Sequence, residues 1–203
     1  MKTRLVAAAL MAALAPVLSH AQDAASPVAV HPVIGLMGTF GGAKLVDVLY
    51  TNGKTSAVTA GGTAYLYGGA ELRSTDLPMP LSLKATVGYH VASAGGDNGD
   101  FRFERIPFEL IGEVDVIPNR LRLGGGLRYD TGVNLSSHGV VAAPATKFQN
   151  ATGGVIQAEW MLGPNFSIVG RYVGIRYRFD DSSTGQQYHA NGNQGGIGIN
   201  WYL

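Results

Sequence analysis

From residue 32 onward, apolar and polar side chains alternate with a period of two along most of the chain. A strand points successive side chains to opposite faces, so this period indicates strands that are apolar on one face and small or polar on the other. In 166–179 the apolar positions change phase near Val173–Gly174, which we interpret as a β-bulge. The pattern predicts eight strands, at residues 33–49, 55–72, 81–92, 101–117, 120–131, 152–162, 166–179 and 194–203.

The last of these strands has the clearest pattern. Its apolar side chains are Ile197, Ile199, Trp201 and Leu203, and glycine, asparagine and tyrosine occupy the places between them. In a transmembrane β-barrel the last strand pairs with the first and its apolar face meets lipid. We therefore expect these four side chains to face lipid.

The connections between the predicted strands alternate in character. Three are short and rich in turn formers, at 74–80, 118–119 and 163–165, and three are longer and polar, at 97–100, 132–151 and 180–193. Asn52–Gly53 is an exception that reads as a tight hairpin turn. Short turns belong to the periplasmic side of such a barrel and longer loops to the outside.

Aromatic residues are expected in two bands where a barrel crosses the two membrane interfaces. With alternating strand directions, the outer rim receives Phe40, Tyr89, Phe103, Tyr129 and Tyr177. The periplasmic rim receives Trp160, Phe166 and Trp201.

The predicted fold class is all-β, an eight-stranded antiparallel up-and-down transmembrane β-barrel. The alternative is a soluble β-sandwich or lipocalin-like barrel with its apolar side chains inside. The phase of the second strand stays open, because Gly61–Gly62 reads as a bulge and either Tyr65 and Tyr67 or Ala64 and Leu66 face lipid.

The N-terminus has the features of a cleaved signal peptide. Lys2 and Arg4 precede the apolar stretch Leu5–Leu18, and Ser19-His20-Ala21 offers small residues for cleavage before Gln22. An N-terminal anchor helix is the alternative, although the stretch is short for one. The expected organisation is a signal peptide at 1–21, a short segment at 22–31 and an outer-membrane barrel at 32–203. Export to the outer membrane of a Gram-negative envelope follows.

The composition excludes several kinds of catalytic and metal site. The chain has no cysteine, so it has no disulfide, thiol nucleophile or thiolate metal site. Its formal net charge is +1, and nothing in it indicates a nucleic-acid partner. The four histidines beyond the signal lie far apart without metal-ligand spacing, at His31, His90, His138 and His189. We expect no metal and no other cofactor.

Charged residues fall on the polar face of the strands, which would be the lumen. The cations are Lys84, Arg102, Arg122, Arg128, Arg171, Arg176 and Arg178, and the acids are Glu104, Glu109, Glu113, Asp115, Asp130 and Glu159. Converging charges can mark a binding or catalytic cavity. The near balance of signs favours a charge-paired plug, because eight strands enclose a bore that side chains just fill. The predicted strand register places Lys84 opposite Glu109, Glu109 opposite Arg128, and Asp115 opposite Arg122.

Ser136-Ser137-His138 could supply a nucleophile and a base, but neighbouring residues on a strand point apart and a triad needs a particular arrangement in space. We do not expect an enzyme.

The whole region after the signal resembles small outer-membrane barrels of the OmpA-like and OmpX-like class. The resemblance rests on the signal, the eight alternating strands and the terminal Ile197/Ile199/Trp201/Leu203 face. The segments 86–90, 98–100 and 105–110 look like a set of such barrels without an assigned role. The class usually ends on an aromatic residue, and Leu203 departs from it.

The resemblance implies a porin-like fold whose partners are outer-membrane lipid, lipopolysaccharide and, during biogenesis, the barrel-assembly machinery. The expected role is structural or one of surface interaction, with a charge-plugged lumen. The alternatives are a conduit for small apolar molecules that opens sideways between strands, and a lipid A-modifying enzyme. The sequence leaves ligand and oligomeric state open.

Overall fold

The structure is a computed structural model, and it describes residues 28–49, 55–74, 77, 79–96, 99–139, 145–181 and 186–203. The expected signal peptide at 1–21, the turn at Asn52–Gly53 and the residues Asp97–Asn98 lie outside this part of the chain. No helix among the described residues is long and apolar enough to cross a membrane.

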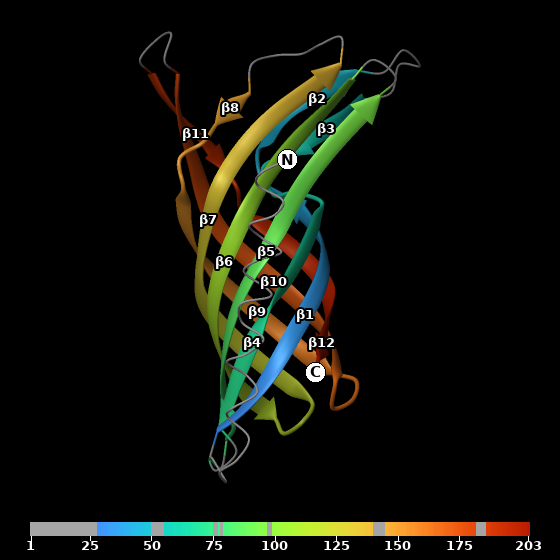
Figure 1. Ribbon diagram of the computed structural model, residues 1–203, viewed down its shortest axis with the longest axis vertical. Helices are drawn as coiled ribbons and strands as arrows, with labels where there is room; N and C mark the ends of the chain where they lie inside the picture. The colour runs from blue at the N-terminus through green and yellow to red at the C-terminus, as the bar shows by residue number, and fades with distance from the viewer. Residues whose placement is uncertain are drawn as a thin grey trace.

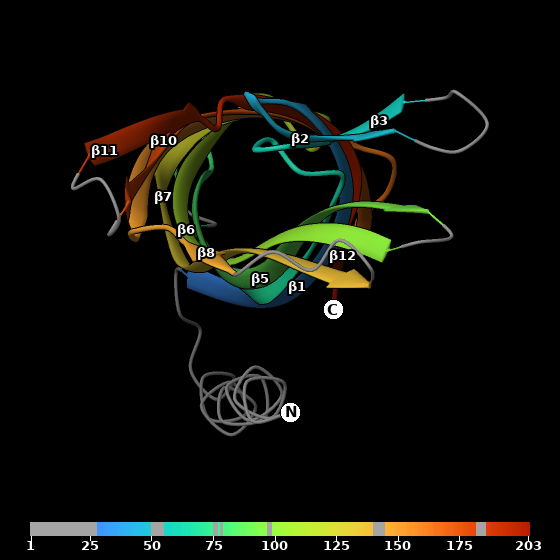
Figure 2. The same cartoon turned by 90° about the horizontal axis from the view of Figure 1, so that it is seen from above.

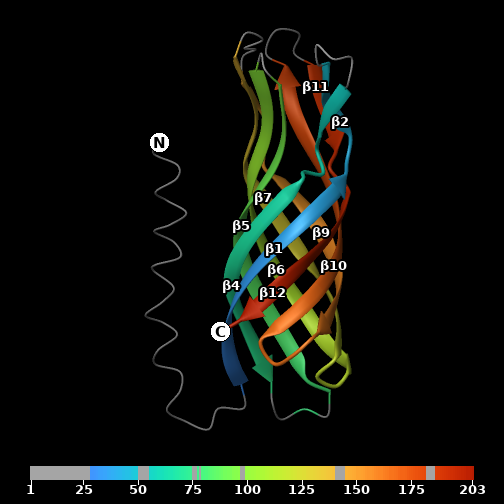
Figure 3. The same cartoon turned by 90° about the vertical axis from the view of Figure 1, so that its right-hand side faces the viewer.

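Eight antiparallel strands pair side by side until the last meets the first, so the sheet closes into a barrel (Figures 1 and 3). Their order around the ring is β1 (Val28–Gly41), β4 (Ala64–Ser74), β5 (Leu81–Gly96), β6 (Gly99–Ile117), β7 (Leu121–Gly139), β9 (Ala151–Met161), β10 (Phe166–Asp181) and β12 (Gln194–Tyr202). Four shorter strands lie outside the ring: β2 (Lys44–Leu49), β3 (Thr55–Thr59), β8 (Thr146–Lys147) and β11 (Gln186–Asn191). The predicted all-β, eight-stranded fold is confirmed.

The ring closes between β1 and β12, as the alternation predicted. Ile34 lies opposite Trp201 and Leu36 opposite Ile199, and the Leu203 amide donates to the Pro32 carbonyl at 3.0 Å. β1 already begins at Val28, within the segment 22–31 that the sequence set apart from the barrel. Closure removes the free edges that an open sheet would expose to lipid.

Both of the first two predicted strands are split in the structure. Gly41, with φ of +109°, ends β1, and Gly42, with φ of +76°, lies between β1 and β2. Gly62, with φ of +82°, precedes β4. A Cβ on Gly42 would come within 2.3 Å of the Gly61 amide nitrogen, so the crossing needs glycine on both sides. As a result β2 and β3 form a two-stranded sheet of their own that leaves the ring on one side, opposite the β10–β11 hairpin (Figure 2).

The outer face of the ring is an apolar belt. All four predicted side chains of the terminal strand, Ile197, Ile199, Trp201 and Leu203, are exposed there. Other strands add Ile34, Leu36, Leu66, Leu83, Phe108, Leu110, Leu123, Leu127, Ile156 and Ile168. Exposed aromatic residues border the belt, with Phe40, Tyr89, Tyr129 and Tyr172 at the end we call the outer rim and Trp160, Phe166 and Trp201 at the other. A continuous exposed belt of this kind is stable in lipid and not in water.

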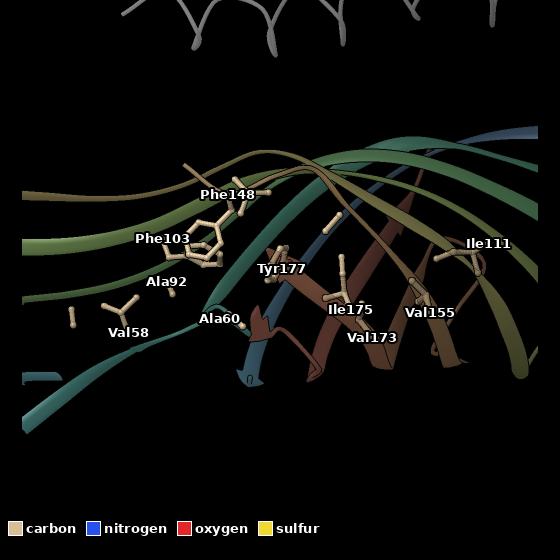
Figure 4. Close-up of a cluster of buried hydrophobic side chains, with 14 residues drawn as sticks. Val58, Ala60, Ala92, Phe103, Ile111, Phe148, Val155, Val173, Ile175 and Tyr177 are labelled. Carbon is tan, nitrogen blue, oxygen red and sulfur yellow. The ribbon is translucent and has the colours of Figure 1, made fainter. Parts of the chain in front are cut away.

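Above the outer rim the polarity of the wall reverses. Phe103 and Tyr177, which the sequence placed on the outside, are fully buried and point inward. They pack edge to face at 5.6 Å in an apolar cluster that also contains Val58, Ala60, Ala92, Phe148, Val173 and Ile175 (Figure 4). The β10 register runs without a shift through Val173 and Gly174, so the predicted bulge there is wrong. The apolar residues turn inward because this part of the wall meets water instead of lipid.

We call the part of the structure beyond the outer rim the crown. It contains β2, β3, β8 and β11 together with the distal halves of β5, β6, β7 and β10. The polar connections predicted at 132–151 and 180–193 are therefore partly strand, since β7 continues to Gly139 and β11 pairs back onto β10.

Candidate functional site

The lumen is filled by polar and charged side chains from all around the ring. Among the described residues, six carboxylates and six cations point into it: Glu71, Glu109, Glu113, Asp115, Asp130 and Glu159, with Arg73, Lys84, Arg105, Arg122, Arg128 and Arg171. Arg73 is the most accessible of the twelve, with 13% of its side chain exposed. The two signs balance, which is the condition under which charges survive burial.

Lys84 holds the periplasmic part of this network together. Its Nζ lies 2.7 Å from a Glu159 oxygen, 3.1 Å from Glu113 and 3.8 Å from Glu71. The other Glu159 oxygen accepts hydrogen bonds from Ser167, Asn200 and Tyr202. Lys84 and its three acidic partners come from four different strands, β5, β4, β6 and β9, so one ammonium group ties opposite walls of the barrel together.

Arg122 and Arg73 complete this end. Arg122 Nη1 lies 3.1 Å from Glu71 Oε2, and its Nε lies 3.4 Å from Asp115 Oδ1. Arg73 pairs with the other Asp115 oxygen. Asp115 also faces Arg122 directly across β6 and β7, as predicted.

Glu109 occupies the middle of the lumen between two arginines. Its Oε1 accepts from Arg128 Nη1 at 3.1 Å, and its Oε2 accepts from Arg171 Nη1 at 2.6 Å. Gln157 holds Arg171 from the other side through two further hydrogen bonds of 2.9 and 2.6 Å to its Oε1. Hydrogen bonds between charged partners are stronger than those between neutral groups, so these contacts hold Glu109 firmly in place.

The outer part of the network centres on Asp130. Arg128 Nε donates to Asp130 at 2.7 Å, Arg105 Nε lies 3.3 Å from it, and Tyr177 also donates to it. Arg105 also donates to Gln194 at 2.9 Å. Tyr177 also belongs to the apolar cluster of the crown, so it connects the crown to the twelve charged side chains in the lumen, which we call the plug.

Two tyrosines of β4 lie inside the network, which decides the phase of that strand. Tyr65 and Tyr67 are buried, their ring centroids are 4.8 Å apart, and Leu66 between them is exposed. Arg128 lies over Tyr65 and Arg171 over Tyr67, each 5.1 Å from the ring centroid. Cation–π contacts of this kind add to the ion pairs in a desolvated site.

One space in the middle of the lumen is closed to solvent. The space bounded by Met37, Tyr65, Arg128, Arg171 and Gln194 contains no volume that a water molecule could occupy. The opening that the ribbon leaves in Figure 2 is thus filled by side chains at this level.

Four predicted lumen charges lie elsewhere. Arg102 and Glu104 are on the outer surface of the crown, 3.9 Å apart and with 38% and 33% of their side chains exposed. Arg176 and Arg178 are exposed on the outer face of β10. All four share their face with the lipid-facing positions lower on the same strands, because the strands do not change phase.

The remaining nine predicted charges, Lys84, Glu109, Glu113, Asp115, Arg122, Arg128, Asp130, Glu159 and Arg171, lie inside. One predicted pair among them is wrong, because Lys84 faces Ile111 and not Glu109. The sequence reasoning missed Glu71, Arg73, Arg105 and His90. Arg105 could have been placed in the lumen from the sequence, because it lies an even number of residues from Glu109 and Glu113 on β6 and so shares their face.

A closed ring with an apolar outside and a charged inside cannot be a soluble sandwich. The protein is a transmembrane β-barrel of the outer-membrane type.

Solved structures that resemble this barrel have little sequence in common with it. Neisserial surface protein A is 9% identical with a TM-score of 0.40, covering 89% of this chain and 99% of that one. OprG of Pseudomonas aeruginosa is 13% identical with a TM-score of 0.39 and coverages of 87% and 94%. AlkL is 10% identical with a TM-score of 0.41 and coverages of 91% and 95%. By name the first is a surface protein and the other two are outer membrane proteins. No family model and no curated protein matches the chain.

The segment Ser136-Ser137-His138 lies at the distal end of β7, in the crown. His138 faces Asp100 on β6, with 3.9 Å between His138 Nδ1 and Asp100 Oδ1, and both are exposed. Ser136 donates to the Arg102 carbonyl at 3.5 Å. Ser137 points to the opposite face of the strand from His138.

Glu109→Gln should destabilise the barrel by about 1.5–3 kcal/mol, the range for a hydrogen bond to a charged group. Glutamine keeps one acceptor, but Arg128 and Arg171 lose the charge that both share. Urea unfolding from vesicles measures the change. Asp47→Asn is the matched control, because Asp47 is 56% exposed and pairs only with Lys44 among its described ion pairs. Equal losses in the two variants would contradict the buried role of Glu109.

Proposed function

We propose that the protein is a non-conducting outer-membrane barrel whose purpose is to hold the crown at the cell surface, where the crown binds a partner. The sealed lumen carries this proposal. Among the residues that the structure describes, six buried carboxylates are matched by six cations, and the space beside Arg128 and Arg171 has no room for water. A barrel built in this way serves as a rigid base better than as a passage.

The crown has the properties of a supported recognition surface. Its inside is packed by the cluster around Phe103 and Tyr177, and its outside carries charges such as Arg102, Arg176 and Arg178. Recognition usually resides on segments that a rigid scaffold positions. The apolar cluster supplies that rigidity without help from lipid.

The β10–β11 hairpin offers the most specific surface within the crown. Phe179 and Tyr188 stack at 5.1 Å with ring planes 14° apart, and Tyr188 is 41% exposed. Beside them Asp180 accepts hydrogen bonds from Gln149 at 2.7 Å and Gln187 at 3.0 Å. A rigid aromatic surface next to fixed polar groups is a common composition of binding hot spots.

Replacing residues 182–191, which include β11, with a short Gly-Ser connection should abolish surface binding while the barrel still folds. The test is retention of cells that display the protein on surfaces coated with extracellular-matrix glycoproteins. Tyr188→Ala should weaken retention, and Tyr172→Ala, on the lipid face of the same hairpin's first strand, should not. Unchanged retention after replacement of β11, and of the β2–β3 hairpin in turn, would contradict the proposal.

We also propose that the barrel is not an enzyme. His138→Ala and Ser136→Ala should leave the mass spectrum of lipid A from the host cells unchanged. A lipid A modification that disappears with His138→Ala would favour the enzyme instead. Uptake of a small apolar molecule that requires the intact barrel would favour the conduit.

A further inference from the structure

The apolar belt contains a concave groove on the side formed by β4, β5, β6 and β7. Its volume is about 560 Å³, within the range of about 300–1,000 Å³ that small-molecule sites occupy. It opens on the outer surface, and its lining also includes Thr86, Glu109 and Arg128, whose side chains point to the lumen.

The groove arises from two neighbouring rows of cross-strand partners that combine small and large side chains. One row runs from Ala70 through Ala85 to Leu110 and Leu127. The next row runs from Gly68 through Val87 to Phe108, Tyr129 and Thr152. The small residues of β4 and β5 form a floor, and the large residues of β6 and β7 form a wall beside it.

The two ends of the groove differ in polarity. Its length lies in the apolar belt, but its outer end reaches Tyr129, a residue of the outer rim, and the exposed Thr152. The Tyr129 hydroxyl accepts a hydrogen bond from Asn150 Nδ2 at 3.0 Å, which adds an exposed amide at the same place. Polar groups therefore gather where the groove leaves the membrane.

We propose that this groove binds one acyl chain of an outer-leaflet lipid, whose head group lies at Thr152 and Asn150. A ligand that fits must be hydrocarbon along its length and polar at one end, and it must point its polar end toward the outside. A bilayer lipid has this polarity and orientation, whereas a flat second copy of the barrel would leave the floor over Ala70 and Ala85 empty.

Photolabelling tests the proposal. The folded barrel is placed in phosphatidylcholine vesicles that contain a trace of phosphatidylcholine with a diazirine in its acyl chain, and labelled peptides are mapped after irradiation. We expect label to concentrate on the lipid face of β4 to β6 relative to β10 and β12. Ala85→Leu and Ala70→Leu, which fill the floor, should each reduce that label several-fold.

Ala158→Leu is the matched control, since Ala158 is an exposed alanine of the belt on β9, outside the groove. It should leave the labelling of β4 to β6 unchanged. Even labelling around the wild-type belt would overturn the proposal whether or not the variants fold. Unchanged labelling in a folded Ala85→Leu barrel, or a protein–protein crosslink through this face in place of lipid label, would also overturn it.

Discussion

Lys84→Met should lower the free energy of unfolding of the barrel by about 3–5 kcal/mol, the cost of removing one partner from a buried ion pair. The ammonium group is fully buried and lies within 3.1 Å of both Glu113 and Glu159. Methionine preserves the length and packing of the side chain but leaves these carboxylates without their cation. Urea unfolding from vesicles, followed by the fluorescence of Trp160 and Trp201, measures the loss.

Two further variants separate charge from packing. Lys44→Met removes a lysine that is 60% exposed and pairs with Asp47 at 3.1 Å, so it should cost at most about 1 kcal/mol. Adding Glu159→Gln and Glu113→Gln to Lys84→Met should recover part of the loss, because the uncompensated charges disappear. A Lys84→Met barrel as stable as the Lys44→Met barrel would show that the network does not hold the walls together.

Leu110→Arg should destabilise the folded barrel by about 2–4 kcal/mol, the cost of a cation on the lipid face near the bilayer midplane. Leu110 is half exposed on β6 within the belt, and its neighbours Ala85 and Leu127 offer no charge to pair with. The fraction that folds into vesicles, read from heat-modifiable migration on a gel, measures the effect.

Ser93→Arg is the control for Leu110→Arg. Ser93 is exposed on the outer face of β5 and lies beyond the outer rim, opposite Arg102. An arginine there meets water, and its repulsion with Arg102 should cost less than about 1 kcal/mol. If Leu110→Arg folded equally well, the belt would not be in lipid.

The eight-stranded ring could be predicted from the sequence because, within the membrane, the alternation of apolar and polar side chains has a single physical cause. Side chains such as Leu36, Leu110 and Ile199 must face hydrocarbon, and their partners on the other face must not. Closure of the first strand on the last also followed, since a terminal strand with an apolar face has no other stable position. Tyr65 and Tyr67 could not be placed, because tyrosine suits either face of a strand. The expected bulge at Gly61–Gly62 also left open which alternate side chains of that strand face lipid.

The same rule gave wrong predictions beyond the outer rim, where the surroundings change from lipid to water. There Phe103 and Tyr177 turn inward, and Arg102 and Arg176 turn outward. A phase assigned from hydrophobicity alone then needs a bulge near Val173 that does not exist. Strict alternation of the two faces along the whole of β6 would have placed Arg105 inside and Arg102 outside.

The error at Lys84 has a different origin. The predicted pairing of Lys84 with Glu109 places the centre of the β5–β6 hairpin between residues 96 and 97. In the structure Gly96 pairs with Gly99, so the centre lies one residue later, and each residue of β5 pairs two positions further along β6. Lys84 therefore faces Ile111, and its acidic partners come from β4, β6 and β9. Contacts across the lumen depend on how the barrel closes, which strand periodicity does not specify.

The proposed function requires that the barrel's own charge pairs seal its lumen. Planar-bilayer recording of the purified, folded protein measures this. A lumen in which Glu109 is held by Arg128 and Arg171, with no room for water beside them, predicts no steady current above that of the bare bilayer. Stable single-channel steps with a linear dependence on voltage would show a continuous aqueous path and would contradict the claim.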